Sequence, residues 1–175
     1  MRFKGANDRS TIVLYRYNPC YNKKAGSKAS CQQHQRYYIE KEKDLKCPRT
    51  QFREDLVKQL KAWREAGNEL IVCLDANQNI YSKVIGKELT NLNGLISSEV
   101  FGSFTGKMFG ATNFNFRGSQ PIDGVWATSG LTVVGACVMP VGFGVGDHRM
   151  FIVDFAMSSM MGNDPQGLFG LHQEN

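Results

Sequence analysis

Polar side chains of catalytic types stand where apolar runs of this chain begin or end. Such a place fixes a side chain to a rigid strand and still leaves it open to solvent. Three carboxylates, one carboxamide and one imidazole are placed in this way: Asp75, Asn77, Asp123, Asp147 and His148.

These side chains are the parts needed to bind a divalent cation and to hydrolyse a phosphodiester. A cation neutralises the phosphate, a base activates water, and donors hold the non-bridging oxygens. Carboxylate oxygens are ligands for Mg²⁺ or Mn²⁺, so the three aspartates are candidates for the cation and the base. His148 can stabilise charge or donate a proton, and Asn77 and Tyr17 can donate hydrogen bonds to the phosphate.

Each of these residues also has a purely structural explanation. Asp75 is of a type that commonly forms the turn after a strand, and Asp123 is also explained as an exposed acid. Asp147 and His148 are equally consistent with a turn beside a partly buried histidine, and Tyr17 with an aromatic packed beside a proline. We favour the chemical interpretation because several separate strand ends carry such groups together.

The elements expected to hold these side chains follow from hydrophobic periodicity. Strands are expected at 10–15, 69–74, 122–128, 131–138 and 149–155, helices at 36–46, 48–66 and 84–92, and loops at 20–35 and 102–118. The helix at 48–66 has the clearest pattern, because its apolar residues recur every three or four positions from Phe52 to Trp63. It leads through Gly67 into an apolar strand, which predicts a helix packed on a sheet.

The formal charge of the chain is +5 at pH 7 and is unevenly divided. Residues 1–64 carry 16 Lys and Arg against 6 Asp and Glu, and residues 65–175 carry 5 against 10. The resulting charges of +10 and −5 suit a polyanion bound by the first part and cations bound by the second. A solvated surface with a chance asymmetry is the alternative.

The length of 175 residues predicts one domain. No window has the roughly 18 apolar residues of a membrane span, and residues 1–10 lack the apolar core of a signal peptide. The five cysteines have no zinc-pair spacing, so reduced thiols are expected. We therefore expect no membrane partner and an intracellular location, nuclear or cytoplasmic.

Four segments, taken in order, resemble motifs of the endonuclease/exonuclease/phosphatase superfamily, the DNase-I-like and exonuclease-III-like phosphodiesterases. Residues 12–19 are similar to the family strand that ends in Tyr-x-Pro, and residues 74–77 to its Asp-x-Asn strand end. Residues 120–126 resemble its Ile-Asp-Tyr-Ile type of strand. Residues 146–149 resemble its closing Ser-Asp-His motif, with glycine in place of the usual serine. The resemblance spans about residues 10–156.

The resemblance implies a role for each matching residue. Tyr17 would contact the phosphate, Asp75 would position and activate the attacking water, and Asn77 would orient that water or the phosphate. Asp123 would pair with His148 and fix the orientation of its ring.

The resemblance also implies a metal site and a fold. Asp147 would lie at the site of Mg²⁺ or Mn²⁺, and His148 would stabilise charge that develops on the phosphate. The implied fold is α+β, a partial two-sheet αββα sandwich of the DNase-I-like type that is truncated at the N-terminus. It would occupy residues 1–157 and be followed by a flexible tail at 158–175.

The chain departs from the family in its first part. The family has an early strand with an Asn and a later strand with a Glu that binds the metal, whereas only about ten residues here precede the strand at 10–15. Glu40, Glu42 and Glu54 lie in helical or charged stretches that do not match that position. The strand at 149–155 would also lose a neighbour and expose an edge. We therefore expect a fragment of a longer protein or a truncated product with impaired chemistry.

Three hypotheses for function remain from the sequence. The first is a metal-dependent phosphodiesterase of the nuclease type that acts on nucleic acid, with DNA expected first, because the first part is basic and no segment is directed to lipid. The second is a truncated, catalytically impaired remnant that at most binds nucleic acid by charge. The third is a small-molecule or lipid-headgroup phosphatase of the same fold. The sequence leaves the oligomeric state open.

Overall fold

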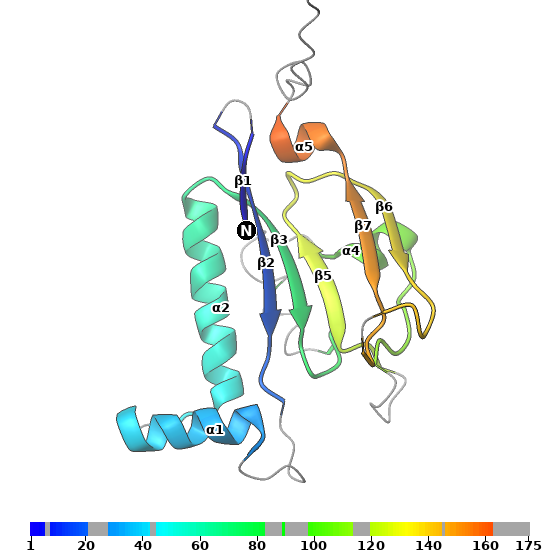
Figure 1. Cartoon of the computed structure of the whole chain (residues 1–175). Helices are drawn as coiled ribbons and strands as arrows, with labels where there is room; N and C mark the ends of the chain where they lie inside the picture. Colours follow the sequence, from blue (N-terminus) through cyan, green and yellow to red (C-terminus); the bar gives the residue numbers. More distant parts are fainter. Residues whose placement is uncertain are drawn as a thin grey trace, which may run out of the picture.

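The structure is a computed structural model that describes residues 1–5, 8–20, 28–42, 45–82, 89, 98–113, 120–144 and 146–162. The described residues form a mixed α+β fold with two β-sheets, so the predicted fold class is confirmed at that level. A long helix packs on one face of the larger sheet, and the smaller sheet packs on the other face (Figure 1).

The strands and helices have the following bounds. The strands are β1 Arg2–Lys4, β2 Ser10–Tyr17, β3 Glu69–Asp75, β4 Ser98–Glu99, β5 Asp123–Ala127, β6 Val133–Val138 and β7 Phe151–Phe155. The helices are α1 Ser30–Tyr37, the π-helix η2 Tyr38–Glu42, α2 Pro48–Glu65, α4 Val100–Thr105 and α5 Met157–Met161.

The larger sheet has the strand order β1-β2-β3-β5-β4, and β6 pairs with β7 in the smaller sheet. β2 and β3 run parallel with α1, η2 and α2 between them in the chain, which is the βαβ connection that parallel neighbours require. Tyr17 is the register partner of Asp75, and Asp75 is the register partner of Asp123. Three of the predicted site residues therefore meet at one end of the sheet.

The helix α2 and the sheet share the first hydrophobic core. Residues of β3 alternate between the two faces of the sheet, and Leu70, Val72 and Leu74 point toward α2. On the helix, Leu56 and Leu60 pack against them, and Leu60 is fully buried. Each such side chain contributes about 1.5–3 kcal/mol by leaving water. The predicted stripe is therefore the contact face of this helix.

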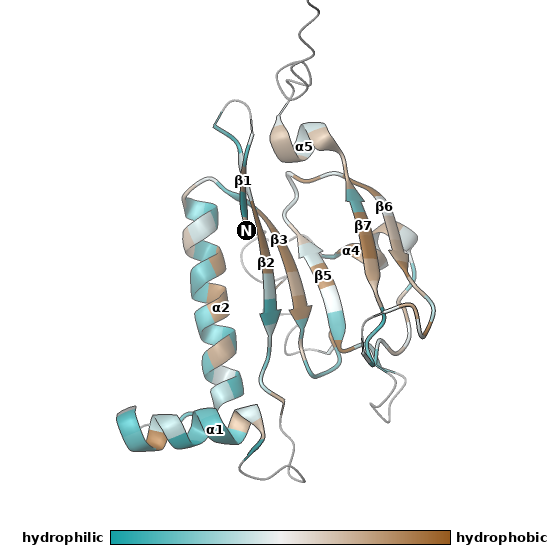
Figure 2. Cartoon of the chain, in the orientation of Figure 1, coloured by the Kyte–Doolittle hydropathy of each residue, from teal (hydrophilic) through white to brown (hydrophobic). Residues whose placement is uncertain are grey.

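The other face of the sheet forms the second core with β6, β7 and α4. Ile71 and Val125 point to this side, which explains why β3 and β5 are apolar on both faces. Figure 2 shows β3 and β7 as largely hydrophobic, in contrast to the mixed surface of α1 and α2. Edge-to-face ring contacts join Phe101, Phe109 and Phe151 at centroid distances of 5.1 to 5.6 Å.

The end of α2 and the start of β3 are set by a tight turn. Gly67 has φ of +79°, a left-handed conformation that glycine adopts without steric cost. The N–H groups of Gly67 and Asn68 donate to the carbonyls of Arg64 and Trp63 at 2.8 and 3.1 Å. Gly67 therefore ends α2 and turns the chain directly into β3, as the sequence predicts.

Several expectations about the local structure were wrong. Residues 30–35, expected in a loop, lie in α1, whose polar sequence buries only Cys31 and so lacks an apolar stripe. Residues 102–105, expected at the start of a loop, belong to the helix α4. The side chain of Glu99 accepts from the N–H groups of Phe101 and Gly102 and caps this helix. The helix expected at 84–92 lies outside the described residues, apart from position 89.

Residues 158–161, which were expected in a flexible tail, are helical. Residues 157–161 form α5, and this helix packs on β2. The hydroxyl of Thr11 donates to the carbonyl of Met160 at 3.0 Å, and Arg9 donates to the carbonyl of Ser159 at 2.8 Å. The domain therefore extends at least through this helix, because α5 is anchored to a core strand.

Candidate metal-binding and hydrolytic site

Asp75 and Asp123 form the centre of the candidate site. Asp75 is the last residue of β3, Asp123 is the first residue of β5, and both are buried, with 8% and 9% of their surfaces exposed. Antiparallel pairing of the two strands sets the two carboxylates side by side. The hydroxyl oxygen of Thr112 accepts from the N–H of Asp123 at 3.2 Å and holds this strand entry in place.

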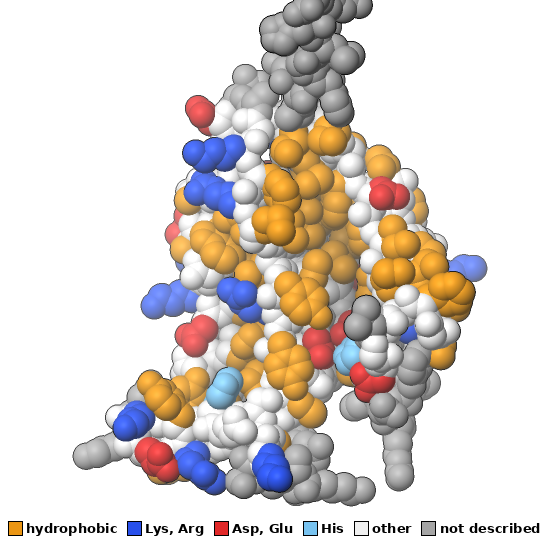
Figure 3. All heavy atoms as spheres, in the orientation of Figure 1, with side chains coloured by type: hydrophobic (Ala, Val, Ile, Leu, Met, Phe, Trp, Pro, Cys, Tyr) orange, Lys and Arg blue, Asp and Glu red, His pale blue; other side chains and the backbone are white. Residues whose placement is uncertain are grey.

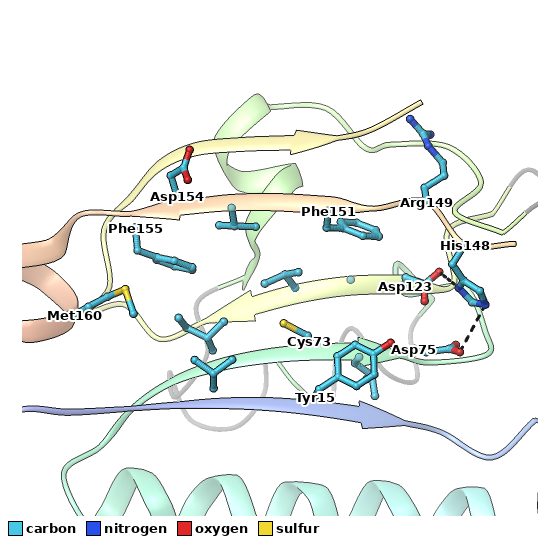
Figure 4. A pocket seen from close by; sticks show the side chains of 16 residues that line it. Tyr15, Cys73, Asp75, Asp123, His148, Arg149, Phe151, Asp154, Phe155 and Met160 are labelled. Carbon is cyan, nitrogen blue, oxygen red and sulfur yellow. Dashed lines mark hydrogen bonds and ion pairs between the residues drawn. The ribbon is translucent and has the colours of Figure 1, made fainter. Parts of the chain in front are cut away.

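His148 joins the two carboxylates from the loop that precedes β7. Its Nδ1 atom lies 2.9 Å from Oδ2 of Asp123, and its Nε2 atom lies 4.0 Å from Oδ2 of Asp75. Figure 4 shows the imidazole beside Asp123, with dashed lines to Asp123 and Asp75, at one end of a cavity. The cluster therefore combines residues from the ends of β3 and β5 in the larger sheet with a residue that precedes β7 in the smaller sheet.

Asn113 also belongs to this cluster, although no motif or periodicity marks it in the sequence. Its Nδ2 atom lies 2.8 Å from Nε2 of His148, and the two residues form an isolated antiparallel bridge. Each nitrogen of the imidazole therefore has a partner. With Nδ1 donating to Asp123, Nε2 accepts from Asn113 when the ring is neutral and carries a proton when the ring is protonated.

Burial and a neighbouring charge raise the pKa of Asp75 to about 6. Burial is the larger cause, and the charge of Asp123 is the next, because two carboxylates in one site oppose each other's ionisation. A hydrogen bond from the N–H of Asn77 and the positive charge of His148 act in the opposite direction. Two crowded carboxylates of this kind favour the arrival of a positive ion.

The pKa of His148 is raised above its ordinary value. Burial lowers the pKa of this imidazole, but the hydrogen bond and charge of Asp123, with the charges of Asp75 and Asp147, outweigh that effect. Asp123 therefore orients the ring and also stabilises its protonated form.

The cluster has the ligands of a metal site. Asp75, Asp123 and His148 each offer one ligand atom, and these atoms lie within 4.8 Å of one another. Carboxylate oxygen and imidazole nitrogen are donors for divalent cations, and the charge of Asp123 is one of the causes that raise the pKa of Asp75. The group can therefore hold a metal ion.

Asn77 lies beside the cluster but directs its side chain away from the cavity. Its Nδ2 donates to the carbonyl of Asn18 at 2.8 Å, and its N–H donates to Oδ1 of Asp75 at 3.0 Å. Its φ of +48° is a left-handed conformation that asparagine tolerates better than most residues. Asp75 therefore also stabilises the turn after β3, which is the structural role that its residue type suggests. Asn77 provides the left-handed conformation of that turn.

Tyr15, and not the predicted Tyr17, lines the cavity that contains the cluster. Tyr17 is 45% exposed and lines a second cavity beside α1 and α2, although it is the register partner of Asp75. Tyr15, which sequence reasoning did not single out, lines the cavity that contains Asp75 and Asp123. Burial and the charges of these two acids raise the pKa of the Tyr15 phenol, so it remains a hydrogen-bond donor at neutral pH.

Asp147 and Arg149 flank the histidine. Oδ1 of Asp147 lies 3.7 Å from Nε2 of His148, and this side chain is more exposed than the two central carboxylates. Arg149 is half-buried. Its guanidinium donates to the carbonyls of Met139 and Val138 at 2.7 and 3.2 Å, which fixes the loop of His148 to β6.

The cavity next to the cluster has a volume of about 590 Å³. Asp75, Asp123 and His148 line one end, and most of the remaining wall is apolar. A ligand that enters this cavity can therefore reach the cluster.

No family model matches this chain, and no curated protein sequence is significantly similar to it. Among the described residues, no helix is long and apolar enough to cross a membrane.

Proposed function

We propose that this chain is a metal-dependent phosphodiester hydrolase of the nuclease type, on a partial αββα sandwich of the DNase-I-like type. The observation that carries the proposal is the meeting of Asp75, Asp123 and His148, whose ligand atoms lie within 4.8 Å of one another. These residues come from separate strand ends, and the same residues carry the motif resemblance. Hydrolysis of a phosphodiester requires this combination of acid, base and charge stabilisation.

The surroundings of Asp75, Asp123 and His148 suit them to different roles in hydrolysis. Asp75 and its neighbours would hold Mg²⁺ or Mn²⁺, which would supply positive charge to the phosphate oxygens. Asp75, once deprotonated, is placed to orient water, and its pKa of about 6 leaves it largely ionised at neutral pH. His148, oriented by the 2.9 Å contact with Asp123, donates a hydrogen bond or a proton to the phosphate.

Nucleic acid is the substrate that the charge distribution favours. Residues 1–64 carry 16 Lys and Arg against 6 Asp and Glu. Arg16, Arg36 and Lys58 are exposed, and Figure 3 shows the basic side chains on the side of α1 and α2. A polyanion can lie along such a surface while one of its phosphates approaches the acidic cluster.

Nicking of supercoiled plasmid DNA tests the proposal. The chain should convert supercoiled DNA to the open circle with Mg²⁺ or Mn²⁺, and EDTA should stop the reaction. Asp75→Ala and His148→Ala should each lower the rate by about 100-fold, a typical loss for a group that acts in acid–base chemistry. Asp154→Asn removes an exposed carboxylate outside the cluster and should leave the rate unchanged.

Two results would contradict the proposal. Nicking that persists in both cluster variants would identify a contaminating nuclease. Cleavage of a soluble sugar phosphate but not of DNA would assign the site to a small-molecule phosphatase of the same fold.

A further inference from the structure

The cavity that ends at Asp75 and Asp123 continues as an apolar groove between the two sheets (Figure 4). β2 and β3 form its floor, and β7 forms its wall. The groove is lined by Val13, Ile71 and Cys73 on the floor and by Phe151, Val153 and Phe155 on the wall.

β7 is an open edge within the part of the chain that the structure describes, because β6 is its one strand neighbour there. The N–H of Met139 donates to the carbonyl of Met150, and the N–H of Ala156 donates to the carbonyl of Thr132, both at 2.9 Å. Backbone groups alternate in direction along an antiparallel strand, so Ile152 also bonds toward β6. The N–H and C=O groups of the alternate residues, 151, 153 and 155, therefore point to the open edge.

The open edge and the apolar floor face the same space. The residues whose backbone groups point outward, Phe151, Val153 and Phe155, also carry the side chains that line the groove. A strand added beside β7 would lie about 4.8 Å from it and would cover the floor. Val13 and Cys73 are partly buried at present, and Tyr15 is 72% exposed, so the floor still has apolar surface to lose from water. Figure 3 shows hydrophobic side chains gathered in this hollow.

The two ends of the groove differ in chemistry. At the far end, Met160 of α5 closes the groove, and α5 is tied to β2 by the hydrogen bond between Thr11 and Met160. At the near end lie the carboxylates of Asp75 and Asp123, with His148 and Arg149 beside them, and the exposed Asp147 adds a third carboxylate next to His148. An occupant that places a positive charge at the near end would be stabilised there.

We infer that this groove binds an extended segment of another polypeptide, which pairs with β7 as an added strand and places a Lys or Arg beside Asp75. Backbone bonds to the edge and alternating apolar side chains against the floor are the means of recognition in β-strand addition. The segment matches β7, Phe151–Phe155, in length. This inference does not depend on catalysis and needs no metal ion.

A fluorescein-labelled peptide tests the inference. The peptide has alternating valine and threonine and a lysine at each end, and its binding is followed by fluorescence anisotropy in EDTA. We expect saturable binding that weakens about tenfold when glutamate replaces both lysines, a loss of about 1.4 kcal/mol. Tighter binding of the glutamate peptide would overturn the charge argument and with it the inference.

Two N-methylated peptides test the backbone pairing on the unaltered protein. One is methylated at odd positions and the other at even positions, so that one set of methyl groups faces β7 and the other faces away. Strand addition predicts that one peptide loses about tenfold in affinity and the other keeps its affinity. Equal affinities for the two peptides would overturn the inference.

Variants of the protein complete the test. Val153→Pro removes an edge donor that is not bonded to β6 and should weaken peptide binding about tenfold, since proline is tolerated on edge strands. Val134→Thr on β6, a position that is 57% exposed, is the matched control and should bind normally. A dimer of the chain alone in sedimentation, abolished by Val153→Pro, would show a second copy as the occupant and overturn the inference.

Discussion

The Nδ1 atom of His148 lies 2.9 Å from Oδ2 of Asp123, although 25 positions separate the two residues in the chain. Asp123 opens β5 in the larger sheet, and His148 precedes β7 in the smaller sheet, so the contact connects the two sheets. Asn113 contacts the other ring nitrogen at 2.8 Å. The imidazole is therefore fixed from both sides, and its protonation depends on the neighbouring carboxylates.

The pKa of His148 should fall when its partner loses its charge. Asp123→Asn removes the hydrogen bond and the charge that contribute most to the raised pKa, so the pKa should fall toward the ordinary histidine value. Two-dimensional NMR of the ring nitrogens against pH measures this shift. Asp154→Asn should leave the titration unchanged, and an unchanged titration in Asp123→Asn would contradict the assigned contact.

The folded chain should become less stable as Asp75 ionises. Its folded-state pKa of about 6 lies above the ordinary value of 3.8, so the folded state binds the proton more tightly than the unfolded state does. The contribution to stability is present below pH 4 and is lost as the pH rises through about 6. At pH 8 the ionised carboxylate costs on the order of 3 kcal/mol, from about two pKa units.

Replacement of this carboxylate measures that cost. Asp75→Asn keeps an oxygen for the N–H of Asn77 and removes the charge. Urea unfolding in EDTA should show the variant to be more stable than the unaltered chain at pH 8 and about equally stable at pH 4. A variant that is less stable at pH 8 would mean that the carboxylate is well compensated in the absence of metal.

Packing behind Asp123 should tolerate no extra atom at the next position. A Cβ at Gly124 would lie 2.8 Å from the ring of Trp126 and 2.9 Å from Ile80. Both side chains are buried, so Gly124→Ala should destabilise the fold by about 1–3 kcal/mol in urea unfolding. The control is Gly110→Ala, where a Cβ would meet nothing within 4 Å. Equal stability of the two variants would contradict the close packing at Gly124.

The parts of the fold with local periodicity could be predicted from the sequence. The stripe of α2, the apolar run of β3 and the strand at β5 each carry a pattern that one segment contains by itself. The helices α1 and α4 have no such pattern. α1 buries only Cys31, and α4 is short and depends on the Glu99 cap, so tertiary contacts decide both.

The candidate site could be predicted where strand ends mark it and not where side chains meet across loops. Asp75 is the last residue of β3 and Asp123 is the first residue of β5, so the antiparallel pairing of these strands brings them together. Asn113 reaches His148 from a loop segment whose sequence shows no periodicity. Alternation along β2 predicts the same side for Tyr15 and Tyr17, but Tyr15 lines the cavity that contains Asp75, and Tyr17 lines the cavity beside α1 and α2.

Binding of Mn²⁺, followed by the electron paramagnetic resonance of the free ion, tests the metal site most directly. The chain should bind the ion at pH 8 and bind it more weakly at pH 5, where Asp75, with its pKa of about 6, is protonated. Asp75→Asn and Asp123→Asn should each weaken binding about tenfold or more, and Asp154→Asn should leave it unchanged. Binding that is unaffected by both cluster variants, or absent from the unaltered chain, would contradict the account.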